Sequence, residues 1–319
     1  MRRRAAVALL GLTGLSAAAK AQPAPGRSIR LIVPYAPGGG TDILSRLIAA
    51  PVGDALGAAV VVENRPGGNS AIGTEAVARA TPDGQTIGMI DLAFLVNPSL
   101  FSLPYDTLRD FTAISLVATT PLVLMVNPRL GVRTMAELVS HIRANAGKVS
   151  FASAGVGTAV HIAGEQLRLA LGTDLLHVPY RGGSLPANAV LTGEVTLAFL
   201  AQSQAGALAT GGQAVAIGIT SASRSAALPD VPTMGELGLP TVDAQTINGL
   251  IAPAGTPGPI LERISTAVAD AVKRPDMLKR MAELGCDPAA SSPAQFSDWI
   301  RAEVAKWREV VRAAKIQPQ

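Results

Sequence analysis

Apolar residues occur along the chain in two alternating patterns, short uninterrupted runs and stripes with helical spacing. The run from Ile29 to Val33 is bounded by Pro34 and predicts a buried strand. Ile43 and its apolar neighbours up to Ile48 then fall on one face of a predicted helix, opposite Ser45. Further strands are predicted at 59–62, 86–90, 149–152, 175–178, 195–199 and 215–220. This alternation predicts an α/β fold of mainly parallel sheets flanked by helices, with ligands beyond the carboxyl ends of the strands.

A glycine-rich turn connects the first predicted strand to the first helix. It consists of Pro37, Gly38, Gly39 and Gly40, and is followed by Thr41 and Asp42 at the start of the helix. Such a turn exposes backbone N–H groups beside the positive end of the helix dipole, where an anion binds. We expect a carboxylate or phosphate there. The alternative is a plain strand-to-helix turn whose glycines only satisfy geometry, and the local sequence does not separate the two.

A dinucleotide fingerprint is a further interpretation of this turn, and its spacing tests it. The pattern G-x-G-x-x-G from Gly38 needs glycine where Ile43 stands. Glu63 does close the next strand at roughly the distance of a ribose-binding acid, so the match is partial. We expect no cofactor.

The same unit recurs in the second half of the chain. The strand at 149–152 leads into a turn and a helix that contains His161, and the candidate residues of the turn are Ser153, Ala154, Gly155, Gly157 and Thr158. Val160 stands where a nucleotide fingerprint needs its third glycine. Two such turns in different lobes could hold one small ligand from both sides. We include His161 in the candidate site, although packing or hydrogen bonding beneath the loop is the commoner role of such a histidine.

Polar residues at three other strand ends complete the candidate site. Asp91 follows the strand at 86–90, and its carboxylate suits a ligand amine or hydroxyl. Tyr180, Arg181 and Gly182 follow the strand at 175–178, and Gln202 follows the strand at 195–199. Arg181 could pair with a ligand carboxylate through two hydrogen bonds, or could be a solvated arginine on a turn.

The first 21 residues have the pattern of a secretory signal peptide. A basic start precedes an apolar run over 5–15, and the segment ends with Ala19-Lys20-Ala21, an A-x-A cleavage site. No later segment approaches the roughly 18 apolar residues that a membrane span needs. We therefore expect Sec export, cleavage near Ala21, and a soluble monomer in the periplasm.

The charge balance changes once this segment is set aside. The whole chain has 27 basic and 23 acidic residues, and four of the basic ones lie in the first 21 residues. The rest of the chain is balanced, which gives no indication of a nucleic-acid partner. Cys286 is the only cysteine, and the three histidines lack metal-ligand spacing, so neither an intramolecular disulfide nor a metal site is expected.

The length beyond residue 21 is at the upper edge of what a single core supports, so two lobes are expected. We place lobe 1 at 22–125 and 250–319, and lobe 2 at 126–249. Apolar runs around Pro121 and over 247–253 are the predicted crossings between them.

Several short motifs together resemble one family. They are Val33-Pro34-Tyr35-Ala36-Pro37-Gly38-Gly39-Gly40-Thr41-Asp42, Val62-Glu63-Asn64-Arg65-Pro66-Gly67, Thr81-Pro82-Asp83-Gly84, His177-Val178-Pro179-Tyr180-Arg181-Gly182-Gly183 and Ala252-Pro253-Ala254-Gly255-Thr256-Pro257. In this order after a signal peptide, they resemble the Bug family, the TctC-like periplasmic substrate-binding proteins of tripartite tricarboxylate transporters.

The resemblance implies a two-lobed periplasmic-binding-protein fold of type II-like architecture, with a ligand cleft between the lobes. It implies a small carboxylated solute held by backbone amides, hydroxyls and ordered waters, and membrane transporter subunits as partners. Tyr35 and residues 37–42 would form one wall, and residues 153–158 and 180–182 the other. Asp42 would repel a bare carboxylate, so we expect it to fix its own loop. The family often carries an aromatic residue where this chain has Thr246-Ile247-Asn248-Gly249.

The preferred interpretation is thus an extracytoplasmic solute-binding protein, not an enzyme, that captures a small carboxylated, amide or amino-acid-like solute for a transporter or a sensor. The alternative is an exported, hydrolase-like enzyme using the same cleft. The chain has no G-x-S-x-G or H-E-x-x-H motif, and although Ser153 and His161 could meet, no acid on that loop completes a triad. A cytoplasmic nucleotide-dependent oxidoreductase is excluded by the signal peptide and the two failed fingerprints.

Overall fold

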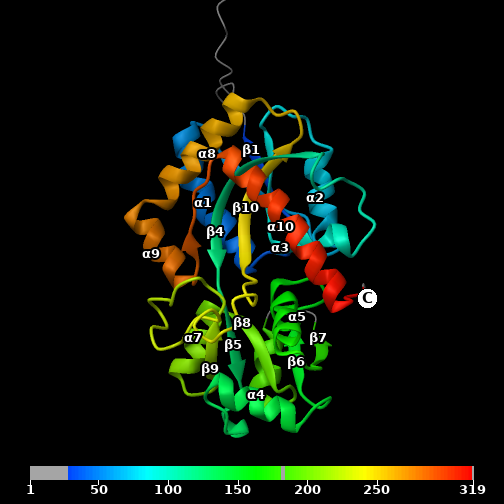
Figure 1. Cartoon of the computed structure of the whole chain (residues 1–319). Helices are drawn as coiled ribbons and strands as arrows, with labels where there is room; N and C mark the ends of the chain where they lie inside the picture. The colour runs from blue at the N-terminus through cyan, green and yellow to red at the C-terminus, as the bar shows by residue number, and fades with distance from the viewer. Residues whose placement is uncertain (1–27, 181–183, 318–319) are drawn as a thin grey trace, which may run out of the picture.

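The computed structural model describes residues 28–180 and 184–317, which form two lobes, each built on its own sheet. Figure 1 shows lobe 1 above lobe 2. The sheet of lobe 1 has the order β11-β4-β10-β3-β1-β2, and the sheet of lobe 2 has the order β7-β6-β8-β5-β9. The predicted signal peptide, residues 1–21, lies outside the described residues.

The elements of lobe 1 come from both ends of the described chain. Its strands are β1 (Ile29–Val33), β2 (Val60–Asn64), β3 (Thr86–Ile90), β4 (Phe111–Thr120), β10 (Thr246–Pro253) and β11 (Asp287–Pro288). Its helices are α1 (Gly40–Leu56), α2 (Ala71–Ala78), α3 (Leu92–Val96), the 3-10 helix η1 (Asn97–Ser99), α8 (Gly258–Val272), α9 (Pro275–Glu283) and α10 (Pro293–Ala314).

Lobe 2 is one continuous stretch of chain. Its strands are β5 (Leu122–Val126), β6 (Ser150–Ser153), β7 (Leu176–Pro179), β8 (Leu197–Ala201) and β9 (Val215–Ile219). Its helices are the 3-10 helix η2 (Pro128–Leu130), α4 (Met135–Ala144), α5 (Ala159–Leu171), α6 (Leu185–Thr192) and α7 (Gln202–Thr210).

The two-lobed α/β prediction is confirmed, but the sheets are mixed rather than mainly parallel. Strands β1, β2 and β3 are parallel, as are β6, β7 and β8. Strand β10 runs antiparallel to its neighbours β3 and β4, and β5 runs antiparallel to its neighbours β8 and β9. Parallel pairing is therefore confined to the strands that carry the strand-to-helix turns.

The crossings occur earlier in the chain than the predicted boundaries at 125 and 250. Thr120 ends β4 in the first sheet, and Leu122 begins β5 in the second, so Pro121 is the crossing residue. The return is complete by Thr246, where β10 joins the first sheet. Proline cannot donate to a ladder, which suits a position between two sheets.

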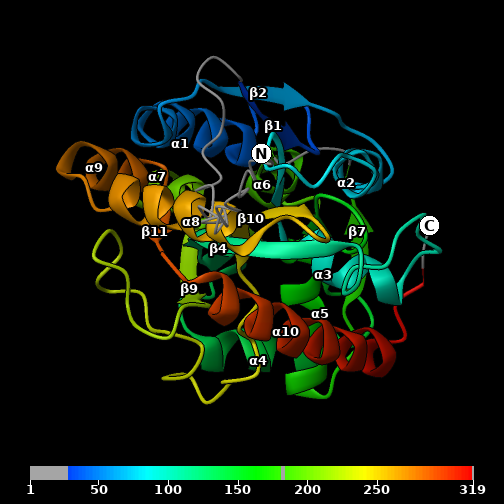
Figure 2. The ribbon, with the colours of Figure 1, turned by 90° about the horizontal axis from the view of Figure 1, so that it is seen from above.

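One apolar core passes through both lobes on the side of α10. It joins Phe94 of α3, Phe151 of β6, Ile162 of α5 and Trp307 of α10. The last turn of α10 is also tied to lobe 2, since Arg168 Nη2 donates to the Ala314 carbonyl at 2.9 Å. Figure 2 shows α10 and α5 on one side of β4 and β10, with α1 and α8 on the other. No helix in the described ranges is long and apolar enough to cross a membrane.

Candidate functional site

The strand-to-helix loops of the two lobes face each other. Because β1, β2 and β3 are parallel, the loops that follow them leave one edge of the lobe 1 sheet, and β6, β7 and β8 behave likewise in lobe 2. Gly157, in the turn after β6, lies against lobe 1. A Cβ at Gly157 would be 3.0 Å from Leu100 Cδ1 and 3.3 Å from Asn69 Nδ2. The lobe 2 turn therefore meets the loops of lobe 1 directly.

The first glycine turn presents its backbone to open space. Residues Pro37 to Gly40 are exposed, and a Cβ at Gly40 would have no neighbour within 4 Å. Gly38 has φ +89°, a left-handed conformation that favours glycine. Gly39 is the N-cap of α1, and Thr41 follows in the first turn, where N–H groups have no helical carbonyl partner. The turn can therefore supply main-chain donors to an anion.

Asp42 is committed to its own loop. Its carboxylate is buried and accepts hydrogen bonds from Gly38 N at 2.9 Å, Asn64 Nδ2 at 2.8 Å and Arg46 Nε at 3.1 Å. Burial alone would raise the pKa of Asp42, but these hydrogen bonds hold it below its ordinary value. Asn64 also donates to the Tyr35 carbonyl at 3.0 Å, so this carboxylate holds the turn against the end of β2.

Tyr35 and Asp91 come together at the ends of the adjacent strands β1 and β3. Asp91 caps α3 by accepting from Ala93 N at 2.9 Å. Burial raises the pKa of Asp91 to about 6, although the adjoining Tyr35 side chain works against the shift. Burial and the Asp91 charge raise the pKa of Tyr35 well above its ordinary value. This corner of lobe 1 is thus an acceptor-rich site beside the glycine turn.

The second glycine turn is fixed by its own hydroxyl groups. Ser153 Oγ accepts from Gly155 N at 3.1 Å and lies 2.6 Å from His177 Nε2. Thr158 Oγ1 donates to the Gly155 carbonyl at 2.7 Å. Ala154 and Gly155 are half-buried, and a Cβ at Gly155 would approach only the Tyr180 carbonyl, at 3.9 Å. The two glycine-bearing loops of lobe 2 are therefore neighbours.

His161 lies beneath the second turn. Its Nδ1 accepts from Gly157 N at 3.1 Å, which places the imidazole proton on Nε2. Its ring stacks on His177 with centroids 4.0 Å apart, and Phe151 stacks on His177 at 4.9 Å. Burial lowers the pKa of His161 to about 3 and that of His177 to about 4. Both rings are neutral near pH 7 and act as a platform for the turn.

The other predicted residues of lobe 2 that the structure describes lie away from the second glycine turn or make other contacts with their side chains. The Tyr180 hydroxyl donates to Glu194 Oε1 at 2.7 Å. Gln202 begins α7, donates its backbone N–H to the Pro121 carbonyl at 3.1 Å, and so lies beside the crossing. Its buried Oε1 has no hydrogen-bond partner among the residues that the structure describes. Arg181 and Gly182 lie outside the described residues.

The structure adds residues that the sequence interpretation left out of the site. Asn69 Nδ2 donates to Asn97 Oδ1 at 2.8 Å, and Asn97 Nδ2 donates to the Asn69 carbonyl at 2.7 Å. Asn69 and Ser70 have positive φ angles of 48° and 76°, an uncommon conformation for residues other than glycine. The run Pro66-Gly67-Gly68-Asn69-Ser70 before α2 was the available signal, because it repeats the turn-then-helix pattern.

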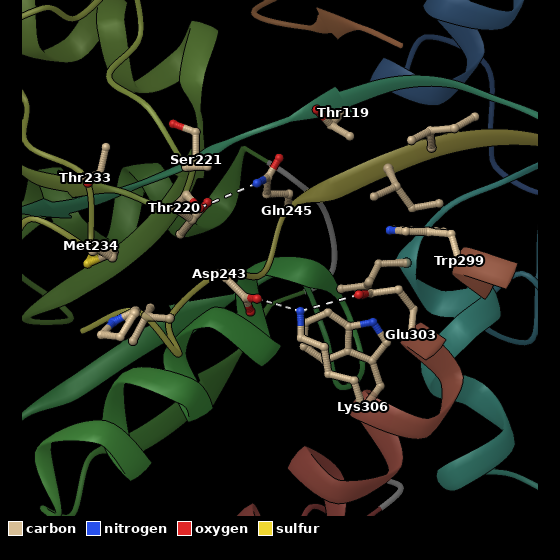
Figure 3. A pocket seen from close by; sticks show the side chains of 18 residues that line it. Thr119, Thr220, Ser221, Thr233, Met234, Asp243, Gln245, Trp299, Glu303 and Lys306 are labelled. Carbon is tan, nitrogen blue, oxygen red and sulfur yellow. Dashed lines mark hydrogen bonds and ion pairs between the residues drawn. The ribbon is translucent and has the colours of Figure 1, made fainter. Parts of the chain in front are cut away.

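A separate cavity of about 480 Å³ lies at the crossings, between α10 and the loops that follow β9 (Figure 3). None of the residues predicted for the site lines it.

Residues 44–316 match the family model of the tripartite tricarboxylate transporter family receptor, TctC. The chain is 35% identical over 314 residues to the UPF0065 protein in the tcbD–tcbE intergenic region of Pseudomonas sp. strain P51, covering 97% of this chain and 94% of that protein. It is 34% identical over 308 residues to Protein BugT of Bordetella pertussis, covering 95% and 94% of the two chains.

Solved structures of periplasmic binding proteins have the same fold as this chain. The periplasmic binding protein BugD superposes with a TM-score of 0.79 at 33% identity, covering 92% of this chain and all of that one. R. palustris Rpa4515 with adipate superposes at 0.83 with 29% identity, covering 93% of this chain and 100% of that one. MatC from Rhodopseudomonas palustris with bound malate superposes at 0.78 with 29% identity, covering 90% and 99%.

Proposed function

The chain belongs to the TctC family of tripartite tricarboxylate transporter receptors, and from this premise we propose that it binds a small carboxylated solute between the facing loops of its two lobes. It is a solute-binding protein with the two-lobed α/β fold of periplasmic binding proteins. The observation that carries the proposal is that each lobe has a glycine turn at a helix N-terminus, on the edge that faces the other lobe, and that Gly157 of the second turn packs against Asn69 and Leu100 of lobe 1.

Main-chain donors account for the anion. The N–H groups at the start of α1 border open space, and no basic side chain is needed to bind a carboxylate there. The Asp42 carboxylate accepts hydrogen bonds from Gly38 and Asn64 and pairs with Arg46, and these contacts offset the repulsion that it would exert on a bound carboxylate. Water can bridge the remaining distance at little cost in affinity, and this tolerates ligands of different length.

The corner formed by Tyr35 and Asp91 would select what the carboxylate is attached to. A carboxyl group whose pKa is raised by burial favours a neighbouring hydrogen-bond donor over a second bare carboxylate. A hydroxyl or amino group on the solute would meet this need. We therefore propose hydroxy- and amino-carboxylates, beside plain dicarboxylates, as the ligand class.

An enzymatic function has one observation in its favour, the 2.6 Å contact between Ser153 Oγ and His177 Nε2. The rest of the geometry opposes it. Ser153 is fully buried and already accepts from Gly155 N, and the rings stacked on His177 are those of Phe151 and His161. No carboxylate among the described residues orients His177 as a catalytic triad requires.

We further propose that the protein is exported, cleaved near Ala21, and acts in the periplasm as a monomer that presents its solute to membrane subunits of a tripartite transporter or to a sensor. The A-x-A sequence and the periplasmic relatives support this proposal. The intact mass of protein recovered from the periplasm is the measurement that checks it, and a retained N-terminus would contradict it.

The binding proposal is tested by thermal unfolding with malate, adipate, a hydroxyl-free short dicarboxylate and the matching neutral diamide. Any solute bound only by the native state stabilises it by about 2.7 kcal/mol at a hundred times its dissociation constant. We expect stabilisation by at least one carboxylate and none by the diamide. Native mass spectrometry of protein from its own periplasm then identifies the bound solute. Equal stabilisation by the diamide, or turnover of the bound solute, would refute the proposal.

A further inference from the structure

The cavity at the crossings has walls from both lobes. On the lobe 1 side it is bounded by α10 and by β4 and β10, and on the lobe 2 side by the hydroxyl-bearing loops that follow β9. Figure 3 shows the hydroxyl groups of Thr220, Ser221 and Thr233 across from Trp299 and Glu303. Its volume of about 480 Å³ is within the range of small-molecule sites.

The wall formed by α10 is aromatic. Trp299 and Trp307 both line the cavity, and they are the only two tryptophans of the chain. Trp307 is fully buried, and its Nε1–H makes no hydrogen bond of normal geometry with any described residue, although it faces the Glu303 carboxyl. The face of an indole ring attracts cations more strongly than any other side-chain ring.

The charged groups of the cavity do not balance. Lys306 Nζ donates to Asp243 Oδ2 at 2.6 Å and lies 4.3 Å from the centroid of the Trp307 ring. The other oxygen of Asp243 accepts from Gln166 Nε2 at 2.8 Å. Lysine and aspartate thus neutralise each other and leave one carboxylate, that of Glu303, as surplus negative charge.

Glu303 is the under-satisfied member of this group. Its side chain is only 16% exposed, and the cation nearest to it, Lys306 Nζ, is 3.6 Å away, beyond hydrogen-bonding distance, while the Asp243 charge acts on it unfavourably. The Lys306 ammonium and the Trp307 indole N–H both face its carboxyl group, but within the described ranges neither makes a hydrogen bond of normal geometry with it. A largely buried carboxylate with no donor in good hydrogen-bonding geometry is costly, and a donor cation placed in the cavity would relieve that cost.

We propose that this cavity is a second ligand site, separate from the carboxylate site between the glycine turns, and that it binds a small organic ammonium ion. The ammonium group would bond Glu303 and the apolar body would lie against the two indole rings. The hydroxyls of lobe 2 would contact the far end of the ligand, so that one ligand touches both lobes. This site does not depend on the identity of the solute bound elsewhere.

Intrinsic tryptophan fluorescence tests the proposal directly, because both tryptophans line this cavity. The full chain is titrated with benzylammonium chloride, and with benzyl alcohol as a neutral probe of the same shape, at constant ionic strength. We expect a saturable change with benzylammonium and an affinity for benzyl alcohol lower by about tenfold or more. Equal affinities would reduce the site to an apolar pocket, and no saturable change would reduce it to a water-filled space; either result overturns the proposal.

Two variants of opposite expected sign sharpen the test. Glu303→Gln keeps the shape and removes the surplus charge, so benzylammonium should bind about tenfold more weakly. Lys306→Met removes the competing internal cation while Gln166 still holds Asp243, so the same probe should bind more tightly. Glu309→Gln is the matched control, on the exposed side of α10, and should leave the affinity unchanged. Weaker binding in both Glu303→Gln and Lys306→Met would indicate general loosening and contradict the site. If a variant does not fold, the comparison of charged and neutral probes on the unaltered protein still decides.

Discussion

Substituting Gly39 by valine separates an effect on ligand binding from an effect on folding. Gly39 is the N-cap of α1 with φ −77° and ψ 163°, an extended conformation that any residue adopts. A Cβ there would come no closer to another atom than 3.9 Å, to the Ala36 carbonyl. The side chain of valine can therefore be accommodated by the folded protein, and it would project where we place the solute.

The expected magnitudes follow from this geometry. A valine is a poorer N-cap than glycine by up to about 1 kcal/mol. Loss of glycine's freedom in the unfolded chain offsets this by about 0.4–1 kcal/mol. The melting temperature should thus change by no more than about 2–4 °C. Displacing a carboxylate from two main-chain donors should cost about 3 kcal/mol, or about a hundredfold in affinity.

Isothermal titration calorimetry with the carboxylate found by thermal unfolding measures the effect on affinity. Gly258→Val is the matched control, because Gly258 likewise lies at a helix N-terminus, as the first residue of α8, also has open space around its Cβ, and follows the end of β10 that points away from the crossing. It should bind normally. Near-normal affinity in folded Gly39→Val would show that the solute does not lie on the first glycine turn.

Other changes probe the loops and their support. Asp42→Ala leaves the donors of the loop without their acceptor and should destabilise the protein by about 2–3 kcal/mol. Hydrogen bonds hold the pKa of Asp42 low, so the stability that this carboxylate contributes should be present at neutral pH and lost as the pH falls through the lowered pKa. An acid denaturation curve that is the same for the variant and the unaltered protein would count against this role of Asp42. The pKa values of His161 and His177 are lowered to about 3 and about 4, so the unfolded chain protonates first as pH falls below 6.5, and stability should drop by on the order of 2 kcal/mol per histidine by about pH 5. His177→Gln should flatten that dependence in urea titrations, and an unaltered slope would show that the ring is not held neutral. Gly157→Ala adds a side chain at φ +81° against lobe 1 and should lower both the melting temperature and the affinity for the solute. Gly172→Ala adds a side chain at φ +60° in open space and should lower the melting temperature only. Equal affinities in the two variants would argue against contact between the lobes at Gly157.

Elements that depend on neighbouring residues were predicted well from the sequence. The spacing of Thr134 and Glu137, three residues apart, predicts a capping box, and this box is present. A helix start is predicted at Ser292-Pro293 and is confirmed, and the structure adds a second capping box there, of Ser292 with Gln295. The pair Thr256-Pro257 has the pattern of an N-cap followed by proline at the first helical position, and this predicts a cap at Thr256 that the structure does not have. Its hydroxyl donates to the Pro253 carbonyl at 2.8 Å, and Pro257 takes the N-cap position of α8.

The inward face of α1 was predicted wrongly. Ile43 is 41% exposed, whereas Ser45 is fully buried and donates to the Thr41 carbonyl. Adjacent apolar pairs at the start of the helix leave the centre of the stripe undecided, and only the later positions Val52 and Leu56 fix it. The helix also continues through Pro51, although a proline inside a helical pattern predicts an end or a kink there.

Contacts between segments that are far apart in the chain could not be predicted from the sequence. Ser153 meets His177 rather than His161, because the parallel register of β6 and β7 pairs Phe151 with His177 and so brings that ring under the turn. The contact between Gly157 and Asn69 and the cavity beside α10 depend on how two lobes dock, which no periodicity encodes.

The place of β10 in the lobe 1 sheet has a consequence for how the protein is made. Synthesis proceeds from the N-terminus, so every strand of lobe 2 exists before β10 appears. Lobe 1 at that stage has β3 and β4 as open edges, because β10 is the strand that fills the gap between them. Unpaired edges recruit wrong strands, from the same chain or from another. The nascent chain thus passes through a stage in which all strands of lobe 2 are present while the sheet of lobe 1 still lacks the strand that joins its two parts. During this stage the chain is most exposed to aggregation.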